Sequence, residues 1–251
     1  MVKQNGLPGG DETIDAILQG KLSIIQRRTG YRFSIDALLL AHFVAPRKYD
    51  RIVDLGAGSG VVALILAALH PAVTVYGVEL QAGLAARARR SAELNGLSGR
   101  VTIQEGNVRA ITSLFSPRTF DLVVANPPYR LAASGRINPD AEKRLARHEI
   151  EARLDDFLTA AIHLLRAKGK VAFVYPAARL VDLVAGMRAR RLEPKRVRLV
   201  HSHSGGEASL ALIEGSKDGR KELKILPPLT IYTPERQYTS EVAAILAGAS
   251  L

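Results

Sequence analysis

The sequence predicts an α/β fold: a doubly wound, mostly parallel seven-stranded sheet that ends in an antiparallel C-terminal hairpin. Between residues 51 and 190, short apolar segments with strand character alternate with helical segments. This alternation is typical of parallel βαβ units. After residue 190, strand-like segments follow one another directly, which favours a terminal hairpin. The 251 residues are enough for one large α/β core.

The N-terminal part differs from this pattern, so residues 1–45 are expected to form an extension to a main domain at 46–251. Residues 1–10 contain Gly and Pro and predict a disordered tip. Ser34 or Asp36 is the expected cap of a helix that ends near Phe43. Further elements are expected in the extension: a short helix at 13–19, and a hairpin of strands at 22–27 and 31–33.

The main domain is read from apolar periodicity and from its breaks at Gly and Pro. Strands are expected at 51–55, 73–78, 101–105, 120–125 and 170–175, and helices at 60–69, 81–95, 108–114, 154–167 and 177–190. The tail predicts strands at 195–201, 208–214 and 224–226, coil through 227–238 and a helix at 240–247.

Composition excludes several classes of protein. The chain has no cysteine, so it has no disulfide framework, no thiolate zinc site and no cysteine nucleophile. Its longest apolar run, 61–69, is too short to span a bilayer, and its N-terminus lacks the apolar core of a signal peptide. A cytoplasmic protein without membrane contact is expected.

The formal net charge is +11, and the positive residues come in clusters. The clusters are Arg27 to Arg32, Arg87 to Arg90, Arg130 to Arg147 and Arg188 to Arg198. Such a charge predicts a polyanionic partner, most simply nucleic acid. The alternative is an arginine-rich proteome in which the charge is incidental. Tryptophan is absent and aromatic residues are few, which argues against broad stacking of a long single strand.

A glycine-rich segment, Asp54-Leu-Gly-Ala-Gly-Ser-Gly60, joins an expected strand to an expected helix. Glycines allow a ligand to approach the backbone, and the helix N-terminus offers unpaired N–H groups. Glu79 ends the next expected strand, where a carboxylate can hold ribose hydroxyls. The spacing G-x-G-x-G differs from the dinucleotide fingerprint G-x-G-x-x-G. Asp54 would repel a pyrophosphate and suit a cationic ligand end.

A second motif, Asn126-Pro-Pro-Tyr129, ends the expected strand at 120–125. Pro127 biases Asn126 toward an extended backbone. The Asn126 amide oxygen and the Pro127 carbonyl can accept both hydrogen bonds of one planar NH2 group while the Tyr129 ring stacks on its face. This combination predicts chemistry on an aromatic exocyclic amine. An Asn-Pro-Pro turn with a packed tyrosine is the alternative.

In this order the two motifs resemble the class I S-adenosylmethionine-dependent methyltransferases. The resemblance implies a Rossmann-like fold, S-adenosylmethionine as cofactor and direct transfer of its methyl group to the substrate nitrogen. The catalytic residues that it implies are Asn126, Pro127, Pro128 and Tyr129. The cofactor-binding residues are Asp54, Gly56, Ala57, Gly58, Gly60, Glu79, Leu80, Asn107, Val108 and Asn126. Asn107 stands where that family commonly has Asp, and a helix-capping turn residue is the alternative there.

A narrower resemblance runs over nearly the whole chain, to the bacterial tRNA1(Val) adenine-37 N6-methyltransferase family. Its head is Leu22 to Gln26 and Tyr31 to Ala41, and its tail is Leu226 to Tyr232 with Tyr238 to Glu241. The middle includes Gly135 to Pro139 and Ala146 to Glu149. The resemblance implies transfer to N6 of an anticodon-loop adenosine in tRNA. It also places Asp36 in a flap over the cofactor.

Other functions share the core motifs and stay open. These are methylation of rRNA guanine N2 or of protein glutamine, and a methyltransferase-like RNA-binding protein that transfers nothing. A small-molecule methyltransferase and a dinucleotide oxidoreductase are less favoured. His148 is read as a helix-face residue, and the 130–147 segment as either a lid or a solvated connection. His201 and His203 share a strand face without a third ligand nearby, so no metal site is expected. The oligomeric state is open.

Overall fold

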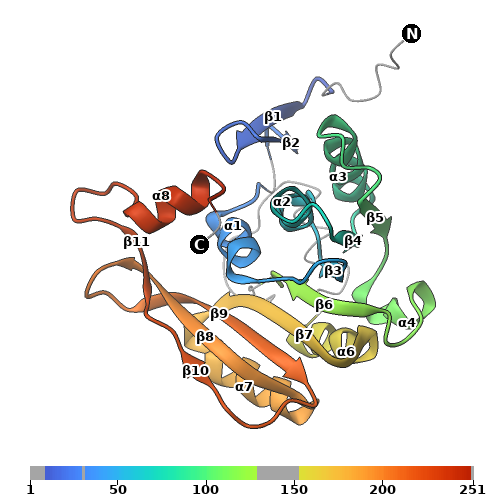
Figure 1. Cartoon of the computed structure of the whole chain (residues 1–251). Helices are drawn as coiled ribbons and strands as arrows, with labels where there is room; N and C mark the ends of the chain where they lie inside the picture. Colours follow the sequence, from blue (N-terminus) through green and yellow to red (C-terminus); the bar gives the residue numbers. More distant parts are fainter. Residues whose placement is uncertain (1–8, 30–31, 129–152, 250–251) are drawn as a thin grey trace.

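The computed structural model describes residues 9–29, 32–128 and 153–249. A central sheet of nine strands has helices on both faces, and a separate two-stranded hairpin lies at the N-terminal end (Figure 1). The hairpin strands are β1 (Glu12–Ile17) and β2 (Leu22–Arg27). The sheet strands are β3 (Arg51–Leu55), β4 (Thr74–Glu79), β5 (Val101–Glu105), β6 (Phe120–Ala125), β7 (Leu165–Pro176), β8 (Leu192–His203), β9 (Ala208–Lys217), β10 (Lys224–Ile225) and β11 (Leu229–Tyr232).

The helices connect these strands and cover both faces of the sheet. They are α1 (Ile35–Phe43), α2 (Val61–Leu69), α3 (Ala82–Leu94), α4 (Ile111–Leu114), α6 (Leu154–Leu164), α7 (Leu180–Ala189) and α8 (Ser240–Leu246), with 3-10 turns η1 (Val108–Ala110) and η2 (Ala177–Arg179). No helix in the described ranges is long and apolar enough to cross a membrane.

The strand order β10-β8-β9-β7-β6-β3-β4-β5 confirms the doubly wound sheet. Strands β5, β4, β3, β6 and β7 are parallel, and β9 runs antiparallel between β7 and β8, which is the expected C-terminal hairpin. These seven strands match the seven that the sequence predicts. Two short strands extend the sheet: β10 and β11 both pair in parallel with β8. The second of them, β11, lies in a segment expected to be coil.

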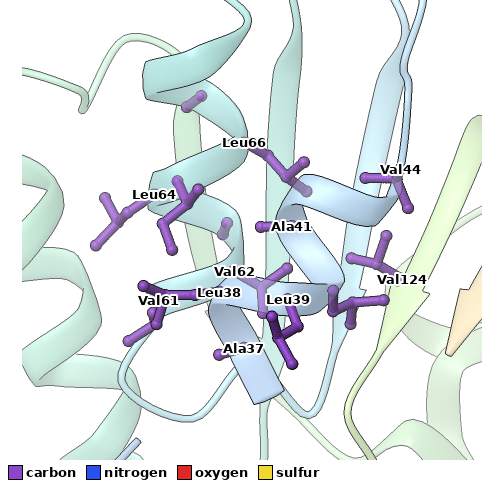
Figure 2. Packing of buried hydrophobic residues seen from close by; sticks show 14 of the residues in the cluster. Ala37, Leu38, Leu39, Ala41, Val44, Val61, Val62, Leu64, Leu66 and Val124 are labelled. Atoms are coloured by element: carbon purple, nitrogen blue, oxygen red, sulfur yellow. The ribbon is translucent and has the colours of Figure 1, made fainter. Parts of the chain in front are cut away.

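Two hydrophobic clusters fill the space between the sheet and its helices. One joins the sheet to α1, α2, α3 and α8, and the other joins it to α4, α6 and α7. Figure 2 shows the first cluster, where Leu39 and Val62 from two helices pack with Val124 of β6. α2 is apolar on all sides because it is covered by neighbours all around, and its residues Val61 to Ala67 are buried. This packing fixes the starts of α1 and α2 beside the ends of the central strands.

The N-terminal prediction is wrong in detail. Residues 13–19 do not form a helix; they contribute to β1, which pairs with β2 as a hairpin. The turn lies at Leu18 and Gln19, both with positive φ, and Gly20. Cross-strand pairing and packing decide the structure here: the Ile25 N–H donates to Ser91 Oγ of α3 at 2.9 Å. Arg32 and Phe33 form no strand, and the tip at 1–8 lies outside the described residues.

Candidate active site

The carboxyl ends of four parallel strands meet at one edge of the sheet. In the register, Leu55 of β3 lies beside Val78 of β4 and Ala125 of β6, and Glu79 lies beside Glu105 of β5. The chain runs from β3 through β4 to β5 on one side and then crosses to β6 on the other. Open α/β sheets bind ligands in the crevice at such a switch point. The glycine-rich segment, Glu79 and Asn126 are therefore brought together, as the sequence predicts.

The glycine loop after β3 is held in a conformation that needs glycine. Gly56, Gly58 and Gly60 have φ of 72°, 57° and 80°, in the left-handed region that side chains disfavour. The N–H groups of Gly56 and Ala57 donate to the Val78 carbonyl at 2.9 and 3.0 Å. A Cβ added at Gly60 would lie 2.9 Å from the Ala88 Cβ. The loop is thus fixed to β4 and to α3 before any ligand arrives.

Two buried carboxylates flank this loop. Glu79 is 6% exposed and accepts hydrogen bonds from the Gly58 and Gln81 N–H groups, both at 2.8 Å. Burial raises its pKa against the lowering effect of those backbone bonds. Asp54 is 1% exposed, and burial, with a further contribution from the Glu79 charge, raises its pKa to about 7. The protein alone disfavours a negative charge at Asp54, and a cation in the crevice would reverse that preference.

A cavity opens beside Asp54 where the loop, α1 and the end of β6 meet. Its lining residues are Phe33, Ala37, Asp54, Gly56, Ala57, Ser59, Val61, Val62 and Asn126. Asp54 Oδ2 and Ser59 Oγ are buried there without a hydrogen-bond partner among the described residues. Buried polar atoms are normally paired. A ligand with a cationic, hydrogen-donating end beside an apolar body fits this lining.

The Asn126 motif borders the same cavity. Asn126 follows β6 directly and is half-buried, Pro127 is buried and Pro128 is exposed. Tyr129, the 130–147 segment and His148 lie outside the described residues. The predicted amine clamp therefore has its asparagine at the cavity wall, one strand away from Asp54.

The remaining candidates do not line the cavity: Leu80 follows β4, Asn107 and Val108 follow β5, and Asp36 lies in α1. Asn107 accepts a hydrogen bond from the Arg109 N–H at 2.9 Å, which is the helix-capping interaction weighed above. Val108 is buried, and Leu80 is 42% exposed. Asp36 lies in the first turn of α1, next to the cavity residue Ala37. Cofactor contacts by these residues stay predictions.

Sequence reasoning did not name five of the lining residues as site residues: Phe33, Ala37, Ser59, Val61 and Val62. Ser59 stands between two loop glycines, a position that could have signalled it. The aliphatic residues carry no such signal, because Val61 and Val62 read as ordinary core of α2. They line the cavity only because α1 packs across the start of α2 (Figure 2).

The positive clusters are largely engaged with carboxylates. In the described part of the chain their ion pairs include Arg27–Asp11, Arg32–Asp15, Arg90–Glu12, Arg188–Glu193, Arg190–Asp155, Arg191–Asp218, Lys195–Glu222, Arg196–Glu214 and Arg198–Glu241. Those of the first two clusters tie the N-terminal hairpin together and to α3. Much of the positive charge from which the sequence analysis predicted a polyanionic partner is thus paired with carboxylates within the fold. The 130–147 cluster lies outside the described residues.

A glycine loop at the switch point, two buried acids beside it and an asparagine at the neighbouring strand end define a class I methyltransferase site. The family model "Methyltransferase small domain" matches residues 34–180. The tRNA1(Val) (adenine(37)-N6)-methyltransferases of Porphyromonas gingivalis and Aeromonas hydrophila are 34% and 31% identical to the chain. The alignments cover 70% of this chain and 71% of the first relative, and 74% and 77% for the second.

Solved structures agree with this class. A predicted O-methyltransferase from Agrobacterium tumefaciens has a TM-score of 0.71 at 25% identity, over 86% of this chain and 98% of that one. TrmN from Thermus thermophilus has a TM-score of 0.54 at 26% identity, over 72% and 48%. The chain belongs to the methyltransferase small domain family and, within it, to the bacterial tRNA1(Val) (adenine-37-N6)-methyltransferase family.

Proposed function

We propose that the protein transfers a methyl group from S-adenosylmethionine to N6 of adenosine 37 in the anticodon loop of a tRNA. The observation that carries the proposal is a cavity that Asp54, Gly56 and Ala57 of the glycine loop, and Asn126 line together. The names of the two relatives supply the base and its position. Methylation of rRNA guanine or of protein glutamine would use the same core but is not favoured by these relatives.

S-adenosylmethionine, when bound, supplies an electrophilic methyl group on a positively charged sulfur. Asp54 attracts the cationic end of the cofactor, which returns the buried carboxyl to its ionised form. Glu79 holds the ribose hydroxyls, since each carboxylate oxygen has a second lone pair beyond its backbone bond. The apolar wall of Val61 and Val62 keeps water away from the reacting centre.

Asn126 and Pro127 act on the substrate amine. An aromatic amine is a poor nucleophile because its lone pair is delocalised into the ring. Two fixed acceptors, Asn126 Oδ1 and the Pro127 carbonyl, favour a tetrahedral nitrogen and stabilise the positive charge that develops on it. The Tyr129 ring would stack on the base and hold it in line for transfer. The proton leaves to water after transfer, so no strong general base is needed.

The N-terminal extension, residues 1–45, acts in this scheme as a flap over the cofactor site of the domain at 46–251. Phe33 and Ala37 support it, because both line the cavity next to Asp54. Asp36 is placed to contact the cofactor from the same turn. A tRNA substrate also implies that the protein works in the cytoplasm.

The test is transfer of a labelled methyl group to tRNA and rRNA that lack the modification and to a protein extract, followed by nucleoside and amino-acid analysis. N6-methyladenosine at position 37 is expected. The matched control is the same tRNA with guanosine at position 37, which should stay unlabelled. Label in rRNA guanosine or in protein would refute the substrate and keep the mechanism. No label on any of these, with normal cofactor binding, would contradict the proposed activity.

A further inference from the structure

The edge of the sheet opposite the active site carries an array of positive side chains. We define the basic edge by its members, Arg118, Arg166, Lys168, Arg191, Lys195, Lys217, Arg220, Lys221 and Lys224. They lie at the amino ends of β6, β7 and β8, at the carboxyl end of the antiparallel β9, and in and before β10. All are exposed except Lys195 and Lys217, which are half-buried.

These cations form a row, because the strands that carry them are neighbours. The order β6-β7-β9-β8-β10 places a lysine or arginine at the same end of each of five adjacent strands. Strands lie about 4.8 Å apart, so the row extends for about 20 Å. A regularly spaced line of positive charge of this length is matched by a polyanionic backbone and not by a small anion.

Few carboxylates neutralise the row. Arg166 pairs with Asp121 at 2.9 Å and Arg191 with Asp218 at 2.6 Å, while Lys195 reaches Glu222 only at 4.0 Å. The other exposed members of the row, Arg118, Lys168, Arg220, Lys221 and Lys224, have no ion-pair partner within the described part of the chain. The Arg118 and Arg191 charges also lower the pKa of Lys217, after the larger effect of burial and against Asp218. The cations are close enough to repel one another.

Three of these cations occupy backbone positions that favour glycine. Arg118, Lys168 and Arg191 have φ of 57°, 61° and 60°, where a side chain strains the backbone. Gly96 and Gly205 occupy comparable positions, and among the described residues so do the non-glycine residues Leu18, Gln19, Tyr49, Asp218 and Arg236. Three cations of the row thus stand at strained turns, and two of them, Arg118 and Lys168, have no ion-pair partner within the described part of the chain.

We propose that the basic edge binds the phosphate backbone of the RNA substrate at a segment away from the methylated base. This inference rests on the proposed function for the identity of the RNA. The six residues of β6 separate Arg118 from Asn126 by about 20 Å along the strand direction. A folded RNA that advances on the order of 3 Å per base pair can reach both edges, while the bare target loop cannot.

The test variant replaces Arg118, Lys168 and Arg191 together by Asn. Asn tolerates the left-handed region and removes the charge, so the fold is expected to be kept. The matched control removes three cations away from the row, as Lys21→Gln, Arg89→Gln and Arg236→Asn. Arg236 has a φ of 61°, so the control includes a strained turn as well. Thermal unfolding of both variants and of Lys168→Asn alone checks the fold.

The readouts are the dissociation constants for full-length tRNA and for a stem-loop around the target adenosine whose stem is too short to span the distance between the two edges. Each is measured over a range of salt concentrations. For full-length tRNA the test variant should bind about 10- to 100-fold more weakly and lower the salt-dependence slope by about 2 to 3. Binding of the stem-loop, affinity for the cofactor and behaviour of the control variant should not change.

Unchanged tRNA affinity and slope would overturn the inference, and so would an equal loss for the stem-loop or the control variant. The two proposals fail separately. If the wild-type protein methylates adenosine 37 but the test variant binds tRNA with the wild-type salt dependence, only the basic-edge proposal is refuted. If it methylates no tRNA but the slope still falls, the substrate is wrong and the RNA-binding surface stands.

Discussion

The two edges of the sheet differ in the sign of their charged side chains and in how deeply those side chains are buried. At the carboxyl edge, Asp54 and Glu79 are buried acids, and burial raises the pKa of both. At the amino edge, Lys168 and Arg118 are exposed cations on strained turns. In the loop after β3, the first edge has glycine at three positions with left-handed φ, which lets a ligand approach. The second edge has charged residues with left-handed φ at Arg118, Lys168 and Arg191. Each edge thus carries an unfavourable charge arrangement that a partner of opposite sign relieves.

The largest effect is expected at the carboxyl edge from Asn126→Ala. Loss of one of two amine acceptors should lower kcat by about 10² to 10³ fold. Affinity for the cofactor, measured by calorimetry, should stay within about twofold, because Asp54 and Glu79 remain. The basic-edge variant should show the reverse pattern, with kcat intact. A turnover that survives in Asn126→Ala would refute the amine clamp.

Asp54→Asn tests the buried acid as a cofactor ligand. The amide keeps the shape but cannot offer a negative charge to the cationic cofactor. A hydrogen bond to a charged group contributes about 1.5 to 3 kcal/mol, so affinity should fall by roughly 10- to 100-fold. Wild-type affinity should also weaken as the pH falls below about 7, where Asp54 becomes protonated. Equal affinities for Asp54→Asn and the wild type at pH 8 would contradict the assigned role.

Alanine substitutions at Gly60 and Gly96 compare how much stability a tightly packed glycine and an openly placed glycine contribute. Gly60→Ala combines a left-handed φ with a Cβ only 2.9 Å from Ala88, whereas Gly96, after α3, has nothing within 4 Å of its added Cβ. Strain alone costs about 1 to 2 kcal/mol, and overpacking adds about 1 to 3 kcal/mol. Urea unfolding should therefore show the larger loss of stability in Gly60→Ala. Equal losses would mean that the loop can move away from α3.

The ligand-free protein should gain stability from Asp54→Asn above neutral pH. The pKa of Asp54 in the fold, about 7, is above its unfolded value, so its stabilising contribution is complete below pH 3.8 and is lost as pH rises through 7. The variant does not carry this titration. Its melting temperature should match the wild type near pH 4, exceed it by a few degrees at pH 8, and show no further gain above that. A difference that does not depend on pH would refute the raised pKa.

The smallest effect is expected from Lys168→Asn. The substitution relieves a left-handed lysine that has no ion pair among the described residues, so stability should stay the same or rise by less than about 1 kcal/mol. Denaturant unfolding measures the stability of the variant, and a tRNA-binding assay measures its affinity for the partner. A large loss of stability would show that Lys168 serves the fold rather than a partner.

The prediction of the fold succeeded where local signals and burial agree. The strands at 51–55 and 120–125 are short apolar runs ended by Gly or Pro, and both lie where expected. It failed at 13–19, because the short, partly polar segment has no clear strand pattern of its own. Its strand conformation depends on pairing with β2. It also missed β11, because the parallel pairing of Leu229 with Val200 joins segments far apart in sequence.

The sequence by itself determined the chemistry of the site: the glycine spacing, the acid at Asp54, and Asn126 before two prolines. These are local features, since backbone freedom and hydrogen-bonding groups belong to single residues. Only the tertiary structure decided which residues share the cavity, which charges are neutralised and which edge stays positive. Those properties depend on distances between separate strands and helices, and the packing of the sheet sets these distances.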